Sequence, residues 1–297
     1  FSGDVFGWYT IQFNGCTNIL SDWGSKAEQK AREAGVNLND YTRLIYVFPS
    51  SHGCDGGVLG RGELGNGASV TRSWIYGSLD KRLFEHEIGH NLGINHANNI
   101  VCNNIGNYSN CKETEYGDIY DVMGKFWAEI VNGNSFHFNG PHKVALGWIP
   151  ETNIKGSIPS GIYTLAPLET ALTPLETLNS GIQILKIPKP DTGNKEYYFV
   201  SYRQRQGFDS TLPDNIVNGA SIHIWRPDPN FPYQTKFLKA VNTGGGNGQD
   251  TLSDGAAFYD KINNISVKQL SHNPNGVTVE VNLSYPPTPT SKPSPTP

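Results

Sequence analysis

Three of the chain's eight histidines lie within the stretch "FEHEIGHNLGINHA", residues 84–97. His86 and His90 are four residues apart, so on a helix both imidazoles project from one face. Gly93 can end that helix because glycine tolerates positive φ, and the turn can bring His96 back as a third ligand. Three neutral imidazoles leave the fourth position of a zinc ion open, as in catalytic rather than structural zinc sites. The stretch therefore predicts a catalytic zinc site.

Glu87 directly follows the first of these histidines. On a helix its side chain points to the neighbouring flank, where it can activate a zinc-bound water as general base without ligating the metal. The alternative is three ordinary histidines on a partly exposed helix, because short motifs recur by chance. That alternative is less favoured, because the three histidines, Glu87 and Gly93 all occur at the spacing of one motif. A second signal also follows downstream. This second signal is Met123, the chain's only methionine, which precedes the turn residue Gly124 in "YGDIYDVMGKF" (116–126).

The elements that must position these residues begin with a helix. Residues 25–35, "SKAEQKAREAG", predict one, with a capping box formed by Ser25 and Glu28. The runs 5–13 and 42–49 on either side predict strands. The order strand, helix, strand indicates a right-handed crossover within one sheet.

The glycine-rich segment 53–67, "GCDGGVLGRGELGNG", has two interpretations. One is a flexible loop, which its turn residues favour. The other is a bulged edge strand beside a cleft, able to pair with an extended peptide.

The second half of the chain reads mostly as strands. Residues 140–147 predict a short helix, with Pro141 at its first position and Gly147 as its C-cap. After Pro150, six short alternating or β-branched runs separated by turn residues predict an antiparallel β-sandwich. The runs are 161–168, 181–188, 196–204, 220–227, 264–271 and 276–285.

The four cysteines are Cys16, Cys54, Cys102 and Cys111, and none forms a Cys-x-x-Cys pair, which argues against a thiolate zinc site. Their even number, the low lysine content and a Pro/Thr/Ser-rich tail suit a secreted or otherwise extracytoplasmic protein with two disulfides. Of the three connectivities, proximity favours Cys16–Cys54 and Cys102–Cys111.

Composition and charge limit the partners. The net charge of −4 indicates no electrostatic attraction to nucleic acid or to an anionic membrane. No apolar run approaches the ~20 residues that span a bilayer. The oxygen-rich segments 228–233 and 244–250 could hold calcium, although turn chemistry explains them better.

Three segments together resemble the gametolysin family of metzincin zinc peptidases: "HEIGHNLGINHA" (86–97), "YGDIYDVMG" (116–124) and "FNGPHKVALGW" (138–148). The segment "AREAGVNLNDYTRLIYVFP" (31–49) is similar as well. The resemblance implies a metzincin-type mixed sheet with an active-site helix and a turn that places Met123 beneath the metal. It also implies a secreted zinc endopeptidase that cleaves extracellular proteins or glycoproteins.

The chain departs from some relatives just after this methionine. Several metzincins have a tyrosine two or three residues later, which serves as an extra zinc ligand and oxyanion donor, whereas this chain has Lys125 and Phe126. No tyrosine switch is therefore expected, and the oxyanion donor stays open, although zinc itself can supply much of the stabilisation as a Lewis acid. His137 and His142 are candidates, but an ordinary structural role is favoured for both. Phe126 and Trp127 are candidates for the wall of the primed-side pocket.

The sequence thus predicts an α+β protein: a metzincin-like zinc peptidase domain (1–152), a β-sandwich domain (153–285) and a proline-rich linker (286–297) that leads to a further module or a surface. The predicted function is zinc-dependent cleavage of a polypeptide or glycoprotein. One alternative is a catalytically inert protein whose β-sandwich binds surface glycans or proteins. Glu87 argues against it, because a purely structural zinc needs no such carboxylate. Hydrolysis of a non-peptide amide is a further alternative, which an extended polypeptide cleft disfavours.

Overall fold

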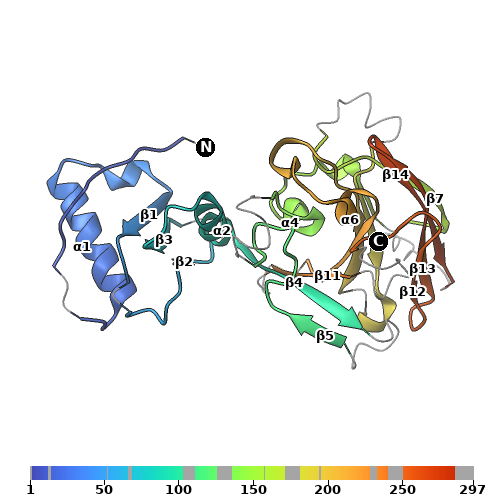
Figure 1. The fold of residues 1–297 in the computed structure, drawn as a ribbon, viewed down its shortest axis with the longest axis horizontal. Helices are drawn as coiled ribbons and strands as arrows, with labels where there is room; N and C mark the ends of the chain where they lie inside the picture. Colours follow the sequence, from blue (N-terminus) through green and yellow to red (C-terminus); the bar gives the residue numbers. More distant parts are fainter. Residues whose placement is uncertain are drawn as a thin grey trace, which may run out of the picture.

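The computed structural model describes residues 2–12, 15–51, 53–65, 69–102, 111–125, 136–156, 158–170, 181–193, 195–227, 233–239 and 250–284. Within them the chain has a mixed α+β fold, rich in strands with few helices, which confirms the predicted class. The strands form sheets of three, seven and four strands. Figure 1 shows an N-terminal part with the smallest sheet and a C-terminal part with the other two.

The N-terminal part consists of α1 (Ile19–Glu33), β1 (Arg43–Phe48), β2 (Gly60–Gly62), β3 (Thr71–Tyr76) and α2 (Lys81–Asn91). Its sheet has the order β1–β3–β2, with β1 parallel and β2 antiparallel to β3. Helix α1 covers one face, where Trp23 packs edge-on against Phe48 and Tyr76. Helix α2 lies on the other face, where the Ser73 hydroxyl donates to the side-chain oxygen of Asn91 at 2.9 Å. Alternate residues of β3 therefore contact the two helices.

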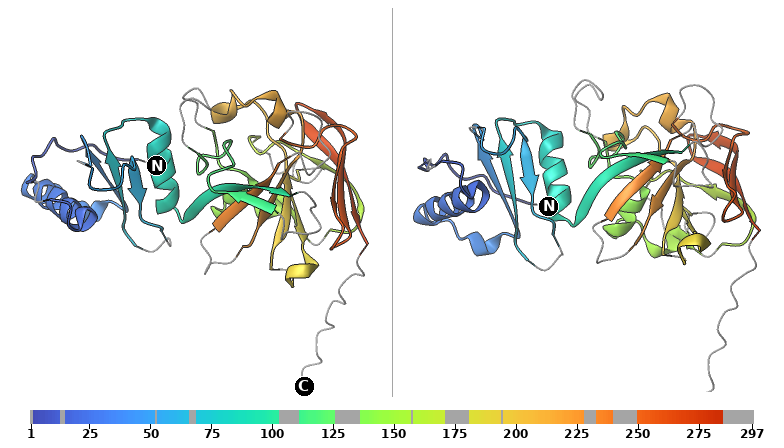
Figure 2. Two further views of the ribbon diagram at one scale, coloured as in Figure 1. Left: turned by 60° about the horizontal axis from the view of Figure 1, so that its bottom comes forward. Right: turned by 90° about the horizontal axis from the view of Figure 1, so that it is seen from below.

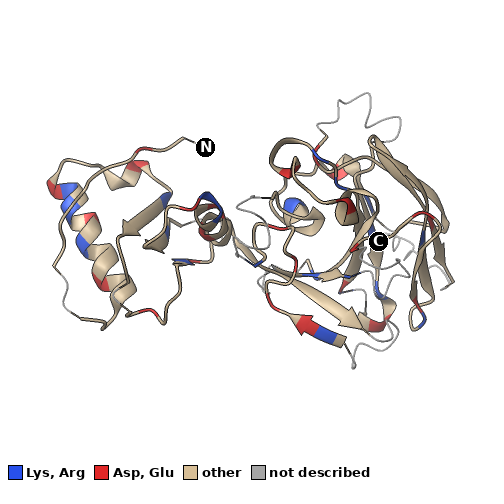
Figure 3. Cartoon of the chain, in the orientation of Figure 1, with Lys and Arg blue, Asp and Glu red and all other residues tan. Residues whose placement is uncertain are grey.

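Helix α1 begins at Ile19, so the predicted capping box of Ser25 and Glu28 is wrong. Glu28 lies inside the helix on its buried side. Its carboxylate accepts hydrogen bonds from the Tyr46 hydroxyl at 2.6 Å and from Arg72 Nε at 2.9 Å. These partners satisfy the carboxylate within the protein, so it does not cap the backbone. Figure 3 shows that α1 also carries charges of both signs along its length.

The predicted strand at 5–13 is wrong as well, because residues 2–12 form no strand. Val5 is fully exposed and Trp8 is mostly exposed, so this run has no sheet against which to bury its apolar side chains. The predicted strand at 42–49 is β1, and its parallel neighbour is β3. The crossover in this sheet therefore runs from β1 to β3. The glycine-rich segment 53–67 contains β2, an edge strand, which favours the second of its two interpretations.

The C-terminal part consists of β4 (Ile94–Cys102), β5 (Cys111–Thr114), α4 (Gly140–Ala145), β6 (Ile154–Gly156), β7 (Gly161–Leu165), β8 (Ile184–Pro188), β9 (Tyr197–Ser201), α6 (Asp214–Val217), β10 (Ser221–Trp225), β11 (Tyr233–Leu238), β12 (Ala257–Asp260), β13 (Ile265–Asn273) and β14 (Gly276–Leu283). The larger sheet has the order β5–β4–β11–β10–β9–β8–β6, and the smaller, antiparallel one has the order β12–β13–β14–β7. Tyr198 of the larger sheet and Val267 of the smaller share one buried hydrophobic cluster, so the two sheets pack face to face. Each of the six predicted runs contains a strand.

Strand β4 joins the two parts of the molecule. It follows α2 directly and runs into the C-terminal part, as Figure 2 shows. There it pairs in parallel with β11, which comes from far along the chain. The seven-stranded sheet therefore takes strands from both sides of the predicted domain boundary at residue 152.

Two disulfides join Cys16 to Cys54 and Cys102 to Cys111, the pairing favoured from the sequence. The second bond links the end of β4 to the start of β5. No helix among the described residues is long and apolar enough to cross a membrane. Outside the described residues lie Phe126, Trp127, the linker 286–297 and nearly all of the two calcium candidates, 228–233 and 244–250.

Candidate metal centre

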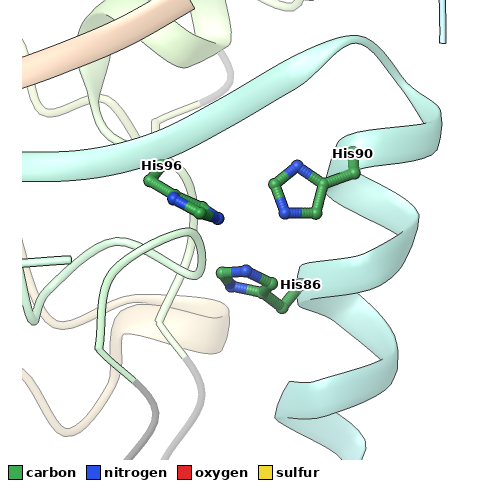
Figure 4. Close-up of side chains that lie close together, drawn as sticks. All are labelled: His86, His90 and His96. Atoms are coloured by element: carbon green, nitrogen blue, oxygen red, sulfur yellow. The ribbon is translucent and has the colours of Figure 1, made fainter. Parts of the chain in front are cut away.

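Helix α2 and strand β4 supply the three histidines. Asp80 caps the start of α2 by accepting a hydrogen bond from a backbone N–H of the first turn at 2.9 Å. His86 and His90 then lie one turn apart. Gly93, with φ 93°, turns the chain after the helix into β4, which carries His96. Figure 4 shows the three imidazoles pointing toward one another, and one ligand atom from each lies within 4.8 Å of the others.

The Nδ1 atom of each ring is engaged by an oxygen that can only accept a hydrogen bond. Each Nδ1 therefore carries the proton, which leaves Nε2 of each ring with a free lone pair. Such partners hold the rings of metal-binding histidines in place in many proteins. The acceptors are the Val122 carbonyl for His86 at 3.0 Å, the Ile94 carbonyl for His90 at 2.9 Å and the Glu115 carboxylate for His96 at 2.8 Å.

Burial keeps these rings neutral. Together with the nearby imidazoles, burial lowers the pKa of His86 to about 3 and that of His90 to about 4. Burial also lowers the pKa of His96, against the opposing influence of Glu115. Neutral imidazoles are the form that ligates metal.

Three neutral nitrogen donors with converging lone pairs fit a zinc ion and leave a coordination position open. The donor set does not fit calcium, which prefers six to eight oxygen ligands. Among the described residues these histidines form the one group of three or more His, Cys, Asp or Glu side chains that could hold a metal. Within the described part of the chain, calcium therefore has no support.

Met123 is fully buried against the helix that carries two of the histidines. A Cβ atom added to Gly89 would lie 2.3 Å from the Met123 sulfur, so glycine is required there for the methionine to approach the helix. The Met123 backbone N–H donates to Asp121 Oδ1 at 2.6 Å. The preceding carbonyl, of Val122, is the acceptor for His86. The turn at Met123 thus packs against α2 and holds the His86 ring through the Val122 carbonyl.

His137 and His142 are not among the residues that line the cleft at the metal centre in the described structure. His142 is fully buried, and its Nδ1 donates to Asp121 Oδ2 at 2.9 Å. Burial lowers the pKa of His137 to about 4, and its backbone N–H donates to Asp209. Both histidines therefore have the structural role that the sequence favours for them.

Glu87 lies beside the three histidines and is 5% exposed. Within the described part of the chain its carboxylate makes no hydrogen bond. Burial raises the pKa of Glu87 to about 8, although the charge of Arg61 opposes the shift. A bound cation would reverse this effect, because a positive charge favours the ionised carboxylate.

The metal centre opens onto a cleft of about 840 Å³. The cleft runs along the edge strand β2, with α2 on one side and α1 on the other. Two of its lining residues, Arg61 and Tyr116, were not singled out as site residues from the sequence. The Tyr116 ring lies 3.9 Å from the ring of His96, centroid to centroid. Burial and the nearby carboxylates of Glu115 and Glu87 raise the pKa of Tyr116, so its hydroxyl keeps its proton.

A three-histidine metal centre with a buried carboxylate beside it, open to a cleft in an α+β fold, has the parts of a metallopeptidase site. Residues 3–239, well over half of the chain, match the model of the gametolysin peptidase M11 family. The chain belongs to this family, which confirms the resemblance drawn from its motifs. No curated protein and no solved structure shows significant similarity to the chain.

Proposed function

We propose that this protein is a secreted, zinc-dependent endopeptidase of the metzincin type. One observation carries the proposal: three imidazoles with free Nε2 atoms converge beside the buried carboxylate of Glu87, at the base of an open cleft. Family membership and the packing of Met123 against the active-site helix support it. The two disulfides support an extracytoplasmic location.

The chemistry divides between the metal and the chain. A zinc ion held by the three histidines would polarise the scissile carbonyl and lower the pKa of a water molecule. Glu87 takes the proton of the attacking water on a carboxylate oxygen and then passes it to the nitrogen of the leaving amine. The lack of a hydrogen-bond donor to this carboxylate in the described structure supports the role.

The edge strand β2 is the proposed binding surface for the peptide main chain. The Leu59 carbonyl accepts from Tyr76 N, and Glu63 N donates to the Arg72 carbonyl, so these groups face β3. In an antiparallel ladder the intervening residues alternate, and the backbone groups of Gly60 and Gly62 therefore point to the open edge. An extended peptide can pair with them by strand addition.

The two glycines of β2 also let the strand approach the active-site helix. A Cβ atom on Gly60 would lie 2.6 Å from a carboxylate oxygen of Glu87, and one on Gly62 would lie 2.6 Å from the Glu87 carbonyl. Neither distance occurs in real structures without a shift of the neighbour. The glycine-rich sequence thus brings the peptide-binding edge next to the general base.

The proposal is tested by metal analysis together with proteolysis. We expect one zinc per chain and cleavage of an unfolded protein such as casein, both abolished by a strong chelator and restored by zinc. Active protein without a tightly bound transition metal would contradict the proposal. Zinc in place with no cleavage of several unfolded substrates would instead favour the inert binding protein. Mass spectrometry of the products would identify hydrolysis of a non-peptide amide.

A further inference from the structure

Tyr116 lies at the metal centre although the sequence before the Met123 turn gives no reason to expect a tyrosine there. It follows Glu115, whose carboxylate accepts the hydrogen bond from His96. The Tyr116 ring lies 3.9 Å from the ring of His96 and 5.9 Å from that of His86, and it lines the same cleft as Glu87. The tyrosine is thus within the group of side chains around the expected reaction site.

The backbone of Tyr116 has an unusual conformation. Its φ of 59° lies in the left-handed region, which few residues other than glycine adopt and which is uncommon for a bulky aromatic residue. Two hydrogen bonds hold it: the Tyr116 N–H donates to Asn98 Oδ1 at 3.1 Å, and its carbonyl accepts from Lys125 N at 2.7 Å. Such conformations are energetically unfavourable and cluster at active sites. The surroundings therefore hold this ring in position against a local preference.

The Tyr116 hydroxyl makes no hydrogen bond within the described part of the chain. The hydroxyls of Tyr46 and Tyr120, by contrast, donate to the carboxylates of Glu28 and Asp250 at 2.6 and 2.8 Å. A hydroxyl held in a cleft without an internal acceptor is available to a ligand.

We propose that Tyr116 is a catalytic residue: its hydroxyl donates a hydrogen bond to the oxygen of the scissile carbonyl as negative charge develops there. The inference rests on the proposed peptidase function. Water oxygen bonds to the carbonyl carbon while the C=O π electrons move to the oxygen and Glu87 takes the water proton. The C–N bond then breaks, and that proton passes to the amine. Tyr116 keeps its own proton throughout and acts only as a donor.

This donor supplies what Lys125 and Phe126 cannot. Phenylalanine has no donor, and Lys125 is not among the residues that line the cleft, whereas Tyr116 is. The tyrosine therefore reaches the metal centre from the start of the segment 116–124 rather than from the residues after Met123. Removing one such donor from a preorganised site lowers kcat by about 10²–10³-fold in other enzymes.

The test is Tyr116→Phe, which keeps the ring against His96 and removes only the hydroxyl. We expect kcat and kcat/KM to fall together by about 10²-fold, because the bond forms only in the transition state. A peptide phosphonate, which mimics the tetrahedral anion, should bind the zinc-loaded variant more weakly by a similar factor in calorimetry. Zinc affinity in competition with a chelator and the melting temperature of the metal-free protein should not change. Tyr259→Phe, at an exposed tyrosine of β12, is the matched control.

Each other outcome has a definite meaning. Full activity and full phosphonate affinity in Tyr116→Phe, beside an active wild type, would overturn the inference and leave the peptidase proposal intact. A drop in zinc affinity that accounts for the lost activity would make Tyr116 a positioning residue and would also overturn it. Wild-type protein that holds zinc and cleaves nothing would overturn the proposed function, and this inference with it.

Discussion

Glu87 in the cleft and Asp209 in the C-terminal part are both buried carboxylates, 5% and 0% exposed, yet their surroundings differ. Glu87 has no hydrogen-bond donor among the described residues. Asp209 accepts from the Arg203 guanidinium at 2.6 and 3.1 Å and from the His137 N–H at 2.8 Å. Burial raises the pKa of Glu87 to about 8. Burial acts in the same direction on Asp209, but Arg203 and the hydrogen bonds outweigh it and hold the pKa at about 2.

The same contrast separates the two regions around these residues. Beneath the metal centre, Asp118, Asp121 and Asp209 each accept at least three hydrogen bonds, and the turn at Met123 rests on this network. In the cleft, Glu87 and Tyr116 are held in place with their polar ends available. Unpaired polar groups reduce stability, and closed networks break when one member is lost. Changes in the cleft should therefore alter activity, and changes in the network should alter stability.

The largest effect is expected for Glu87→Gln. The side chain is nearly isosteric and three imidazoles remain, so zinc content and fold should persist. Turnover should fall by roughly 10²–10⁴-fold, because the group that accepts the water's proton is gone. His90→Ala is the matched variant, and it should lose both zinc and activity. Zinc content and turnover are measured for both variants. Loss of zinc in Glu87→Gln would make Glu87 a ligand, and near-normal turnover with zinc in place would refute its role as base.

Asp209→Asn should lower the free energy of unfolding by an amount comparable to the rise in activation energy expected for Glu87→Gln. The substitution removes the closer of two carboxylates from the buried Arg203 guanidinium and leaves Glu169, 3.5 Å from its Nε, as the remaining charge partner. Breaking a buried pair of this kind costs about 3–5 kcal/mol. Denaturant unfolding of the metal-free protein measures it. The control is Asp214→Asn, which breaks the exposed pair with Arg205 and should cost at most about 1 kcal/mol. Equal losses in the two variants would show that burial does not separate the two pairs.

Local patterns in the sequence predict much of this fold. The histidine spacing and Gly93 describe a helix and a turn, and the six runs after residue 152 each contain a strand, because alternation is a short-range signal. The parallel pairing of β4 with β11 has no such signal, since it depends on residues far apart in the chain. The same limit explains the capping-box error, because Glu28 is satisfied by Arg72 of a distant strand.

The candidate site divides in the same way. Its three histidines and Glu87 belong to one extended motif and could be proposed from spacing alone, and Met123 could be proposed from the family resemblance of the segment 116–124. Tyr116 could not, because its ring reaches His96 only through a left-handed turn held by Asn98 and Lys125. A signal was present in part: the tyrosine begins the segment 116–124 that carries the family resemblance.

An effect of opposite sign is expected when Glu87→Gln is compared with wild type without metal. The folded-state pKa of Glu87 is about 8, above its ordinary value near 4.5. The folded protein therefore binds more protons than the unfolded chain between these pH values, and the free energy of unfolding falls as pH rises through the window. Glutamine does not ionise, so the variant does not lose this stability as pH rises. Near pH 8 its free energy of unfolding should exceed that of wild type by on the order of a few kcal/mol, since each pKa unit corresponds to about 1.4 kcal/mol.

Denaturant unfolding of both metal-free proteins at several pH values from 4.5 to 8 measures this difference. The histidines respond to pH in both proteins, so subtracting the two curves isolates Glu87. A difference that does not grow with pH would contradict the raised pKa. With zinc bound the difference should shrink, because the cation favours the ionised carboxylate.

The smallest effect is expected for Glu115→Ala, which removes the acceptor for His96 Nδ1. The ring can then rotate or shift its proton to Nε2, and zinc affinity should fall. Losses of such supporting partners range from about 10-fold to 100-fold in metal affinity. The Glu115 side chain is 59% exposed, so water can replace it in part and the loss should lie near the lower limit. Glu115→Gln keeps an acceptor oxygen and should retain most of the affinity. Competition with a chelator measures all three proteins, and equal zinc affinity in Glu115→Ala would show that His96 needs no support from the turn that also holds Tyr116.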